Sequence, residues 1–133
     1  MEDIILTGRV VSGVGEGRYF TQLDWVREQF VTNFGFDPAP GTFNVRINPE
    51  QTYLLRRLDQ YRGVKILPPD NKFCAAKCFP VKVGVVKGVL VTPLVEGYSE
   101  DVMEIMAPVN MRQSLNIKDD DIVEVCVLVK GCP

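Results

Sequence analysis

The chain has 133 residues, of which 46% are hydrophobic and 24% are charged, and its formal net charge is −2. These are the proportions of one globular domain with a sizeable core, so they exclude a disordered chain, and the slight negative charge argues against a protein that binds duplex DNA. No apolar run approaches the roughly 18 residues of a transmembrane helix, and the start Met1-Glu2-Asp3 is acidic where a secretory signal is basic, so we expect a cytoplasmic protein that uses neither membrane nor nucleic acid.

The first third of the chain predicts a strand, a glycine-rich break and a helix. β-rich residues 4–11 indicate the strand, and three glycines within five positions break regular structure over 12–18. Thr21 is the expected N-cap of the helix, with Asp24 as its capping-box partner. One face of that helix is apolar at four positions, Leu23, Val26, Phe30 and Phe34. Gly35 is well placed to end the helix in a left-handed conformation.

The middle of the chain predicts strands with one short helix between them. Residues 42–47 alternate, with Phe43, Val45 and Ile47 on one face, as in an amphipathic strand. Residues 50–61 suit a short helix. The Val-rich stretch 72–93, with glycines at 84 and 88, indicates two or more strands.

The last third begins with a strand over 102–107. Asn110 is the expected cap of a short helix, with Gln113 at the third position of a capping box. Residues 116–121 form a polar turn. The nearly all-apolar stretch 122–129 predicts a final strand that is buried on both faces.

Six or seven strands therefore outnumber two or three short helices and do not alternate with them. This pattern favours a mainly β fold, a small closed β-barrel with short α insertions, over a doubly wound sheet. We see no internal repeat and no interdomain linker, so residues 1–133 are expected to form a single domain.

The residue types present in the chain exclude several catalytic mechanisms. The chain has no histidine, which excludes a Ser-His-Asp triad, a Cys-His pair and a histidine-ligated catalytic zinc. Its cysteines are Cys74, Cys78, Cys126 and Cys132. Their spacings do not match the paired C-x2-C pattern of a common zinc site, so we interpret them as buried or incidental thiols.

The first candidate site is the glycine-rich stretch from Gly13 to Tyr19. Closely spaced glycines let backbone N–H groups approach phosphate oxygens, and Arg18 adds a cation that can bind phosphate through two hydrogen bonds. The spacing fits neither the P-loop nor the dinucleotide-binding pattern. A glycine-rich hairpin loop without a ligand is the alternative interpretation.

The second candidate is the pair Thr42 and Asn44, which follows the turn at Pro40-Gly41. On a strand, both side chains point to the face away from the core. A hydroxyl and an amide oxygen side by side can ligate Mg²⁺ or hold a phosphate. The alternative is a pair of solvent-facing polar residues on an amphipathic strand.

Two further candidates lie in the last third. Glu104 shares a strand face with Met106, and a carboxylate buried there needs a partner; the helix start near Asn110 offers a place for an anion or polar ligand. An exposed Glu on an amphipathic strand is the alternative. The acidic residues Glu96, Glu100 and Asp101 favour a solvated loop.

Several distinctive sequence motifs follow one another along the chain: GRVVSGVGEGRYF from Gly8 to Phe20, NFGF over 33–36, PGTFNV over 40–45, EIMAPVNMR over 104–112 and LNIKDDDIV over 115–123. In this order they resemble the CTP-dependent riboflavin kinases of archaea. Ordered motifs spread over about 110 residues are far more specific than any one of them.

The resemblance implies a closed cradle-loop β-barrel of about six strands, unrelated to P-loop and protein-kinase folds. It implies a phosphotransferase that moves the γ-phosphate of CTP to riboflavin and gives FMN and CDP. Its partners would be these small molecules, and Mg²⁺ would accompany the nucleotide. Some relatives carry an N-terminal winged-helix domain. Because this chain begins almost at the first strand, we expect no such extension.

The resemblance also implies site residues by position. The nucleotide would contact Val14, Gly15, Glu16, Gly17, Arg18 and Tyr19, and its site would be completed by Val109, Asn110, Met111 and Arg112. Thr42 and Asn44 would hold Mg²⁺, and Glu104 would contact the flavin. Where the family often has a Thr for a second flavin contact, this chain has Glu96, and Ser99 is close enough to substitute.

Two other functions remain compatible with the sequence. A barrel of this kind can be a DNA-binding or assembly module that dimerises, or a carrier of flavin or nucleotide without turnover. The sequence names no general base, because histidine is absent and Glu104 is assigned only to the flavin. It does not fix the strictness for CTP, the metal preference or the oligomeric state, for which a monomer is the working expectation.

Overall fold

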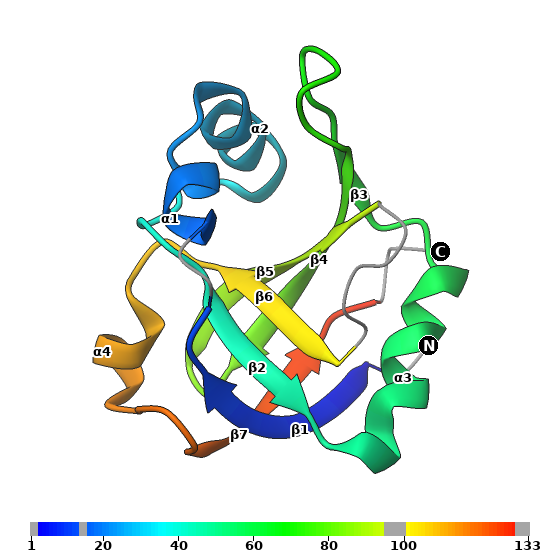
Figure 1. The fold of residues 1–133 in the computed structure, drawn as a ribbon, viewed down its shortest axis with the longest axis vertical. Coiled ribbons are helices and arrows are strands. Elements are labelled where there is room, and N and C mark those ends of the chain that lie inside the picture. Colours follow the sequence, from blue (N-terminus) through cyan, green and yellow to red (C-terminus); the bar gives the residue numbers. More distant parts are fainter. Residues whose placement is uncertain (1–2, 14–15, 95–100, 130–133) are drawn as a thin grey trace.

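The computed structural model describes residues 3–13, 16–94 and 101–129. Its seven strands form one sheet in the order β3-β4-β5-β6-β2-β1-β7, and every pairing is antiparallel. The strands are β1 (Ile4–Val11), β2 (Phe43–Ile47), β3 (Val64–Ile66), β4 (Ala76–Val83), β5 (Val86–Pro93), β6 (Val102–Met106) and β7 (Ile122–Val127). Short helices connect them: α1 (Glu16–Thr21), α2 (Asp24–Phe34), η1 (Pro49–Gln51), α3 (Thr52–Arg56), η2 (Arg57–Gln60) and α4 (Met111–Leu115) (Figure 1).

The sheet closes on itself through one additional pairing. β4 pairs with β7 at Val81 opposite Val127 and at Lys82 opposite Cys126, so six strands form a ring, and β3 extends the sheet beyond β4. Closure removes the open edges that six of these strands would otherwise expose. The predicted closed barrel of about six strands with short helical insertions is confirmed.

The inside of the barrel is filled by apolar side chains that alternate along each strand. In β1 the buried residues Ile4, Leu6 and Val10 alternate with more exposed ones, and Phe79 and Met103 face them from β4 and β6. Burying each large apolar side chain contributes roughly 1.5–3 kcal/mol, so this interior supplies most of the stabilisation of the fold.

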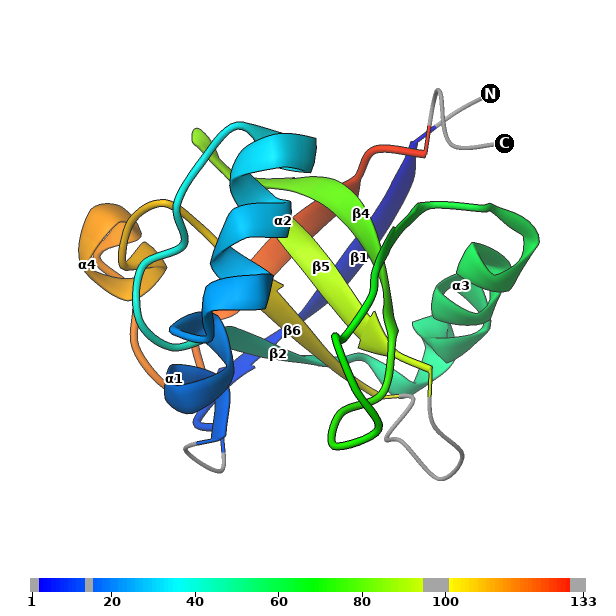
Figure 2. The same ribbon diagram turned by 90° about the horizontal axis from the view of Figure 1, so that it is seen from above.

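A second apolar cluster lies outside the barrel, beneath α2. Val26 and Phe30 of α2 are fully buried against Val89, Val91 and Met106 of the sheet. Leu23 and Phe34 pack around them, which confirms the predicted apolar helix face. Figure 2 shows α2 lying across the outer face of the sheet. Only part of that face is covered, because α2 has 11 residues.

Gly35 ends α2 as predicted. Its φ is 78°, and its N–H donates to the carbonyl oxygens of Phe30 and Val31 at 3.1 Å each. A left-handed residue at this position suits glycine because it has no Cβ.

The start of the helical region differs from the prediction. Regular structure resumes at Glu16, so Glu16, Gly17 and Arg18 are helical, and Thr21 ends α1 instead of capping the next helix, α2, which has Leu23 as its N-cap. Thr21 is fully buried: its Oγ1 donates to the Arg18 carbonyl at 3.0 Å and accepts from Gly41 N–H at 3.0 Å. Its hydroxyl is therefore used to fix the turn at Gly41 and not to start a helix.

Two strand predictions need correction. β7 is not buried on both faces: Val125 and Val127 are fully buried, whereas Ile122 is 68% exposed and Glu124 is exposed. The outer face of β7 is solvent-facing because α2 covers a different part of the barrel. β3 was not predicted, since its three residues are too few to show a pattern. Residues 50–61 do form short helical turns, and 72–93 does contain two strands, β4 and β5, joined at Gly84.

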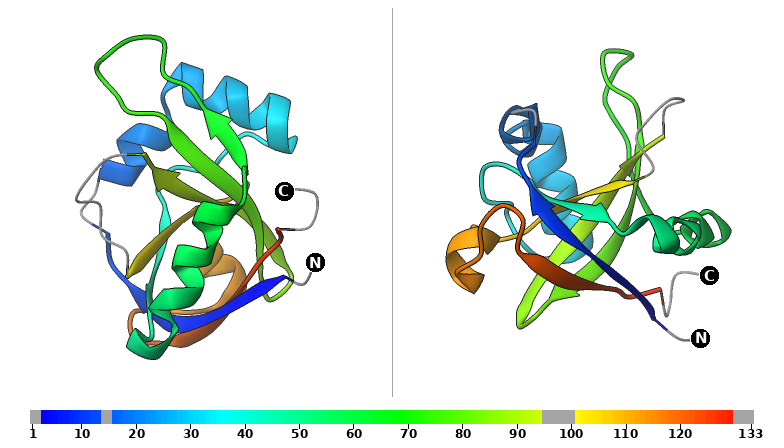
Figure 3. Two further views of the ribbon diagram at one scale, coloured as in Figure 1. Left: turned by 90° about the vertical axis from the view of Figure 1, so that its right-hand side faces the viewer. Right: turned by 60° about the horizontal axis from the view of Figure 1, so that its bottom comes forward.

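The two short helices at the sides of the barrel lie far from each other. Figure 3 shows α3 and α4 on opposite sides, and Figure 1 agrees. α4 lies beside the turn that leads into β7, while α3 packs near β1. The candidate segments described next gather on the α4 side.

Candidate functional site

Strand register brings three of the candidate segments together. Asn44 of β2 lies opposite Val11 on one side and opposite Glu104 on the other. The neighbouring residues Phe43 and Ile105 face the barrel interior, so Asn44 and Glu104 share the outer face. The prediction that Asn44 points away from the core is confirmed, and Glu104 is its direct cross-strand neighbour.

Asn44 is not a solvent-facing residue. Its side chain is 6% exposed, although it lies on the outer face of the strand. Its Nδ2 donates to the backbone oxygen of Thr42 at 3.2 Å and to Thr42 Oγ1 at 3.3 Å. The amide is therefore held against Thr42, and these contacts do not use its carbonyl oxygen, Oδ1. Thr42 precedes β2, which begins at Phe43.

The end of β1 closes over this amide. A Cβ added at Gly13 would lie 2.7 Å from Asn44 Nδ2, which is closer than real Cβ atoms approach a heavy atom. Any larger residue at Gly13, the first position of the predicted glycine-rich stretch, would therefore displace the Asn44 amide.

A small pocket joins the Thr42 segment to the Asn110 segment. It has a volume of about 80 Å³ and is lined by Pro40, Gly41, Thr42, Phe43, Ile105, Ala107, Val109, Asn110, Met111 and Arg112. Two hydrogen bonds from backbone N–H groups hold its walls: Ala39 N–H donates to the Ala107 carbonyl at 2.8 Å, and Gly41 N–H donates to Thr21 Oγ1. The pocket is large enough for a phosphate-sized group and too small for a whole nucleotide.

Arg112 lines this pocket and is held from the opposite side. Its Nη2 donates to the Val11 carbonyl at 3.1 Å and lies 2.6 Å from Asp119 Oδ1. The pKa of Asp119 is lowered from its usual value by the hydrogen bond from Arg112 and, next, by the one from Ser12. Asp119 was not among the predicted site residues: it lies in the predicted polar turn and in the 115–123 motif, to which no site role was assigned.

Asn110 caps α4 as predicted. Its Oδ1 accepts from Gln113 N–H at 3.1 Å. Since α4 has five residues and this oxygen already serves its first turn, the helix start by itself offers little to an anion.

The predicted nucleotide segment is described only in part. Val14 and Gly15 lie outside the described residues, while Glu16 and Gly17 open α1. Arg18 and Tyr19 are exposed, Tyr19 at 64%. Both residues are thus available to a ligand from solvent.

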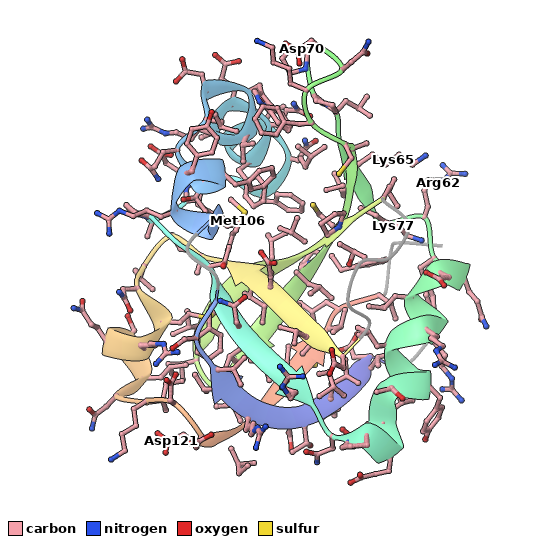
Figure 4. All side chains as sticks on the ribbon, viewed as in Figure 1. Arg62, Lys65, Asp70, Lys77, Met106 and Asp121 are labelled. Atoms are coloured by element: carbon pink, nitrogen blue, oxygen red, sulfur yellow. The ribbon has the colours of Figure 1, made fainter. Side chains whose placement is uncertain are left out.

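The structure also describes only some of the candidate flavin contacts. Glu104 is half-buried in β6 opposite Val91 and Asn44, and the predicted shared face with Met106 is confirmed. Figure 4 shows Met106 pointing from β6 toward the helices. Glu96 and Ser99 lie outside the described residues.

Sequence reasoning missed a group of aromatic rings beside this face. Phe73 contacts Tyr19 at 6.4 Å and Trp25 at 5.6 Å between ring centroids, and Trp25 contacts Phe20 edge-on at 5.8 Å. Phe20 and Trp25 also pack on the outer apolar cluster that contains Val91. Tyr19, Phe20 and Trp25 lie close together in the sequence, so their grouping could have been predicted. Phe73 comes from the segment between β3 and β4, and its position beside them could not.

The cysteines and the acidic residues show no further site within the described part of the chain. Cys74, Cys78 and Cys126 are free thiols, and burial raises the pKa of Cys78 to about 12. No three Cys, Asp or Glu side chains of residues 3–13, 16–94 and 101–129 gather into a group that could hold a metal ion. Over the same residues, none of the helices has the length and apolar character needed to cross a bilayer.

Comparison with known proteins adds family information to this geometry. The family model CTP-dep_RFKase, described as a domain of unknown function, DUF120, matches residues 10–127. A riboflavin kinase of Archaeoglobus fulgidus is 42% identical over 129 residues, which are 95% of this chain and 55% of that protein. A riboflavin kinase of Pyrobaculum aerophilum is 40% identical over 95% of this chain and 61% of its own length. One of Methanocella arvoryzae is 37% identical over 91% and 56%. The chain thus spans between half and two thirds of the length of these relatives.

Proposed function

The chain belongs to the CTP-dependent riboflavin kinase family, and we propose that it transfers the γ-phosphoryl group of CTP to the ribityl 5′-hydroxyl of riboflavin, giving FMN and CDP. The observation that carries the proposal is that Asn44 lies beside Glu104 in the sheet and opposite Val11, whose carbonyl accepts a hydrogen bond from Arg112. Asn44, Glu104 and Arg112 are the positions to which the resemblance gave the metal, flavin and nucleotide contacts.

The proposed reaction needs positioning and charge neutralisation more than covalent help from the protein. The ribityl oxygen forms a bond to the γ-phosphorus, the bond from that phosphorus to the β-phosphate oxygen breaks, and the hydroxyl proton is released to solvent. Holding the two substrates in line and stabilising the charge on the transferred group supply most of the catalysis in phosphoryl transfer.

For the nucleotide, the proposal combines residues 14–19 with the pocket between Thr42 and Arg112. Residues 14–19 would approach the phosphates from one side, and Val109, Asn110, Met111 and Arg112 would complete the site from the other. The pocket of about 80 Å³ between Thr42 and Arg112 suits a phosphate group and leaves the base outside it. Arg112 offers a planar cation that binds phosphate through more than one hydrogen bond.

Mg²⁺ fits the donor set at Thr42 and Asn44. A hydroxyl and an amide carbonyl are hard oxygen ligands, and Mg²⁺ commonly takes few protein ligands together with substrate phosphates and water. The hydrogen bonds of Asn44 use its Nδ2 and so do not use the oxygen that a metal would need. When bound, the ion would neutralise phosphate charge beside Arg112.

For the flavin, we assign Glu104 as a hydrogen-bond acceptor and the ring surface of Tyr19, Trp25 and Phe73 as the apolar wall for the isoalloxazine ring. Glu96 and Ser99 remain proposed contacts. Glu104→Gln should weaken riboflavin binding, measured by quenching of flavin fluorescence, and leave CTP binding unchanged. An unchanged riboflavin affinity would remove Glu104 from the flavin site.

The other functions make different predictions. A DNA-binding or assembly module should purify without colour, whereas a protein with a flavin site can retain a yellow ligand that absorbs near 450 nm, as flavins do. A carrier would bind riboflavin without producing FMN. Family membership favours the kinase over both. We also propose that residues 1–133 fold as one domain and act as a monomer in the cytoplasm, with size-exclusion chromatography as the test of the oligomeric state.

The first test is conversion of riboflavin to FMN followed by liquid chromatography, with CTP, ATP, GTP and UTP in parallel and with or without Mg²⁺. FMN formed preferentially with CTP and Mg²⁺ is the expected result. Equal rates with ATP would support the riboflavin kinase activity but contradict the assignment of CTP as its phosphate donor. Folded protein that makes no FMN with any donor would bring the binding-module function forward.

A further inference from the structure

One carboxylate outside the predicted site joins separate segments of the proposed nucleotide site. Ser12 Oγ donates to Asp119, at 3.2 Å from Oδ1 and 2.9 Å from Oδ2, and Arg112 Nη2 lies 2.6 Å from Oδ1. The same Nη2 donates to the carbonyl of Val11. A single carboxylate and a single guanidinium nitrogen therefore tie the end of β1 to α4, across about a hundred residues of sequence.

The turn that carries Asp119 is itself anchored to β1. Asp120 N–H donates to the Val10 carbonyl at 2.8 Å, and Val10 N–H donates to the Asp121 carbonyl at 2.9 Å. On the other side of Asp119, Lys118 N–H donates to Asp121 Oδ2 at 2.9 Å. Figure 4 shows Asp121 in this turn, beside α4. Since the backbone on both sides is held, Asp119 is the fixed partner, and Ser12 and Arg112 are the groups that it orients.

Stability alone does not account for this arrangement. The side chains of Arg112 and Asp119 are 35% and 55% exposed, and exposed ion pairs contribute little to the free energy of unfolding. A second pair of similar exposure, Arg27 with Asp37, joins α2 only to the turn that follows it. The Asp119 contacts instead join the end of β1 to α4, whose residues Met111 and Arg112 line the pocket.

The geometry also leaves Arg112 able to bind a ligand. Both of its described contacts use Nη2, and a guanidinium carries N–H donors on two further nitrogens. Arg112 lines the pocket that contains Thr42. A guanidinium fixed at one nitrogen can present the others to a phosphate with little loss of rotamer freedom.

Resting on the proposed kinase function, we propose that Asp119 is a positioning residue that holds Ser12 and Arg112, so that the end of β1 and α4 receive the phosphates of CTP as one preformed site. Asp119 does not touch the substrate. Its role is to orient the groups that do.

Steady-state kinetics of Asp119→Asn, with CTP and riboflavin varied separately, test this role. Loss of a residue that orients a ligand-binding group commonly lowers the affinity for the ligand tenfold or more. We therefore expect the KM for CTP to rise about tenfold while the KM for riboflavin stays unchanged. Asp119→Glu, which keeps the charge, should recover part of the loss. An unchanged or lower KM for CTP in Asp119→Asn would overturn the proposal, the lower value meaning that Asp119 competes with phosphate for Arg112.

Asp37→Asn is the matched control, since it breaks an Arg–Asp pair of similar exposure that lies outside the lining of this pocket. It should leave both KM values unchanged. An equal rise of the CTP KM in this variant would mean that the effect is a general consequence of losing a surface ion pair, and would also overturn the proposal.

A measurement without turnover separates this proposal from the kinase function. Hydrogen exchange of the Ser12 and Gly13 amides should be faster in Asp119→Asn than in Asp37→Asn, because the contact that holds the strand end is lost. Wild-type protein that makes no FMN would refute the kinase function while the exchange difference stands. Active wild-type protein with equal exchange and equal CTP KM in both variants would refute the positioning role alone.

Discussion

The two faces of β2 and β6 differ in what they bury. Their inner face carries Phe43, Val45, Met103 and Ile105, all within the barrel core. Their outer face carries Asn44 and Glu104, side by side, next to the apolar residues that α2 covers. One sheet therefore stabilises the fold on one side and presents polar groups on the other.

The difference shows how a polar side chain can be buried outside the barrel core. Asn44 is 6% exposed without lying in the core, because Gly13 and Thr42 close over it. Burying an amide is costly unless its hydrogen bonds are satisfied, and here Thr42 accepts two of them.

The largest expected effect is on the inner face. Phe79→Ala removes a large buried ring from the barrel core, where the ring is 1% exposed. The free energy of unfolding should fall by about 3–5 kcal/mol, because the cavity that remains cannot collapse fully. Urea denaturation followed by circular dichroism measures it. A loss below about 1 kcal/mol would mean that the inner face is not the main source of stability.

On the outer face, Asn44→Ala should affect turnover far more than folding. If Asn44 holds the metal and orders Thr42, kcat/KM for FMN formation should fall about a hundredfold, since small displacements of reacting groups cost that much. The midpoint of urea denaturation should change much less than in Phe79→Ala. Arg46→Ala, on the same outer face of β2 but in a surface ion pair with Asp101, is the control that should retain activity.

The contrast between the faces also explains what the sequence could predict. The inner face follows strand periodicity, so β1 and the apolar side of β2 were predicted with the correct residues. The outer face depends on which helix covers which strand. That is why β7 was wrongly predicted to be buried on both faces: its sequence is nearly all apolar, but Ile122 on its outer face is 68% exposed.

For the candidate site, the family resemblance identified the candidate residues, and the fold shows which of them lie close together. Asn44 opposite Glu104 follows from antiparallel register, which no local pattern specifies. Asp119 and Phe73 were missed because each reaches the site from a turn or connecting segment whose path depends on the whole fold. Thr21 was misassigned because a hydroxyl before an apolar run is typical of an N-cap, whereas here it supports the turn at Gly41.

Gly13→Ala tests the close approach of the end of β1 to Asn44 on the outer face. The new Cβ would contact Asn44 Nδ2, so this buried amide must shift, and we expect activity to fall roughly tenfold with a small change in stability. Gly84→Ala is the matched control: it lies in the β4–β5 turn at φ 58°, so alanine should cost about 1 kcal/mol through backbone strain while the activity of the folded protein is retained. Equal activity loss in both variants would contradict the role assigned to Gly13.

The smallest effect expected is the response of the surface ion pairs to acid. Asp37 and Asp119 both have a lowered pKa, caused first by the hydrogen bond from Arg27 in one case and from Arg112 in the other. A carboxylate whose pKa is lower in the folded state stabilises the fold above its unfolded pKa, near 3.9, and this contribution is lost as the pH falls through the folded pKa. Between pH 6 and pH 4.5 the contribution of either pair to the melting temperature should therefore not change with pH, and below about pH 4 wild type should lose more of its stability than Asp37→Asn does. Thermal denaturation of both proteins over this range tests the sign. A wild-type curve that converges on the variant as the pH rises instead of as it falls would mean that the pair does not hold the ionised form of Asp37. The same comparison with Asp119→Asn tests the Arg112–Asp119 pair separately.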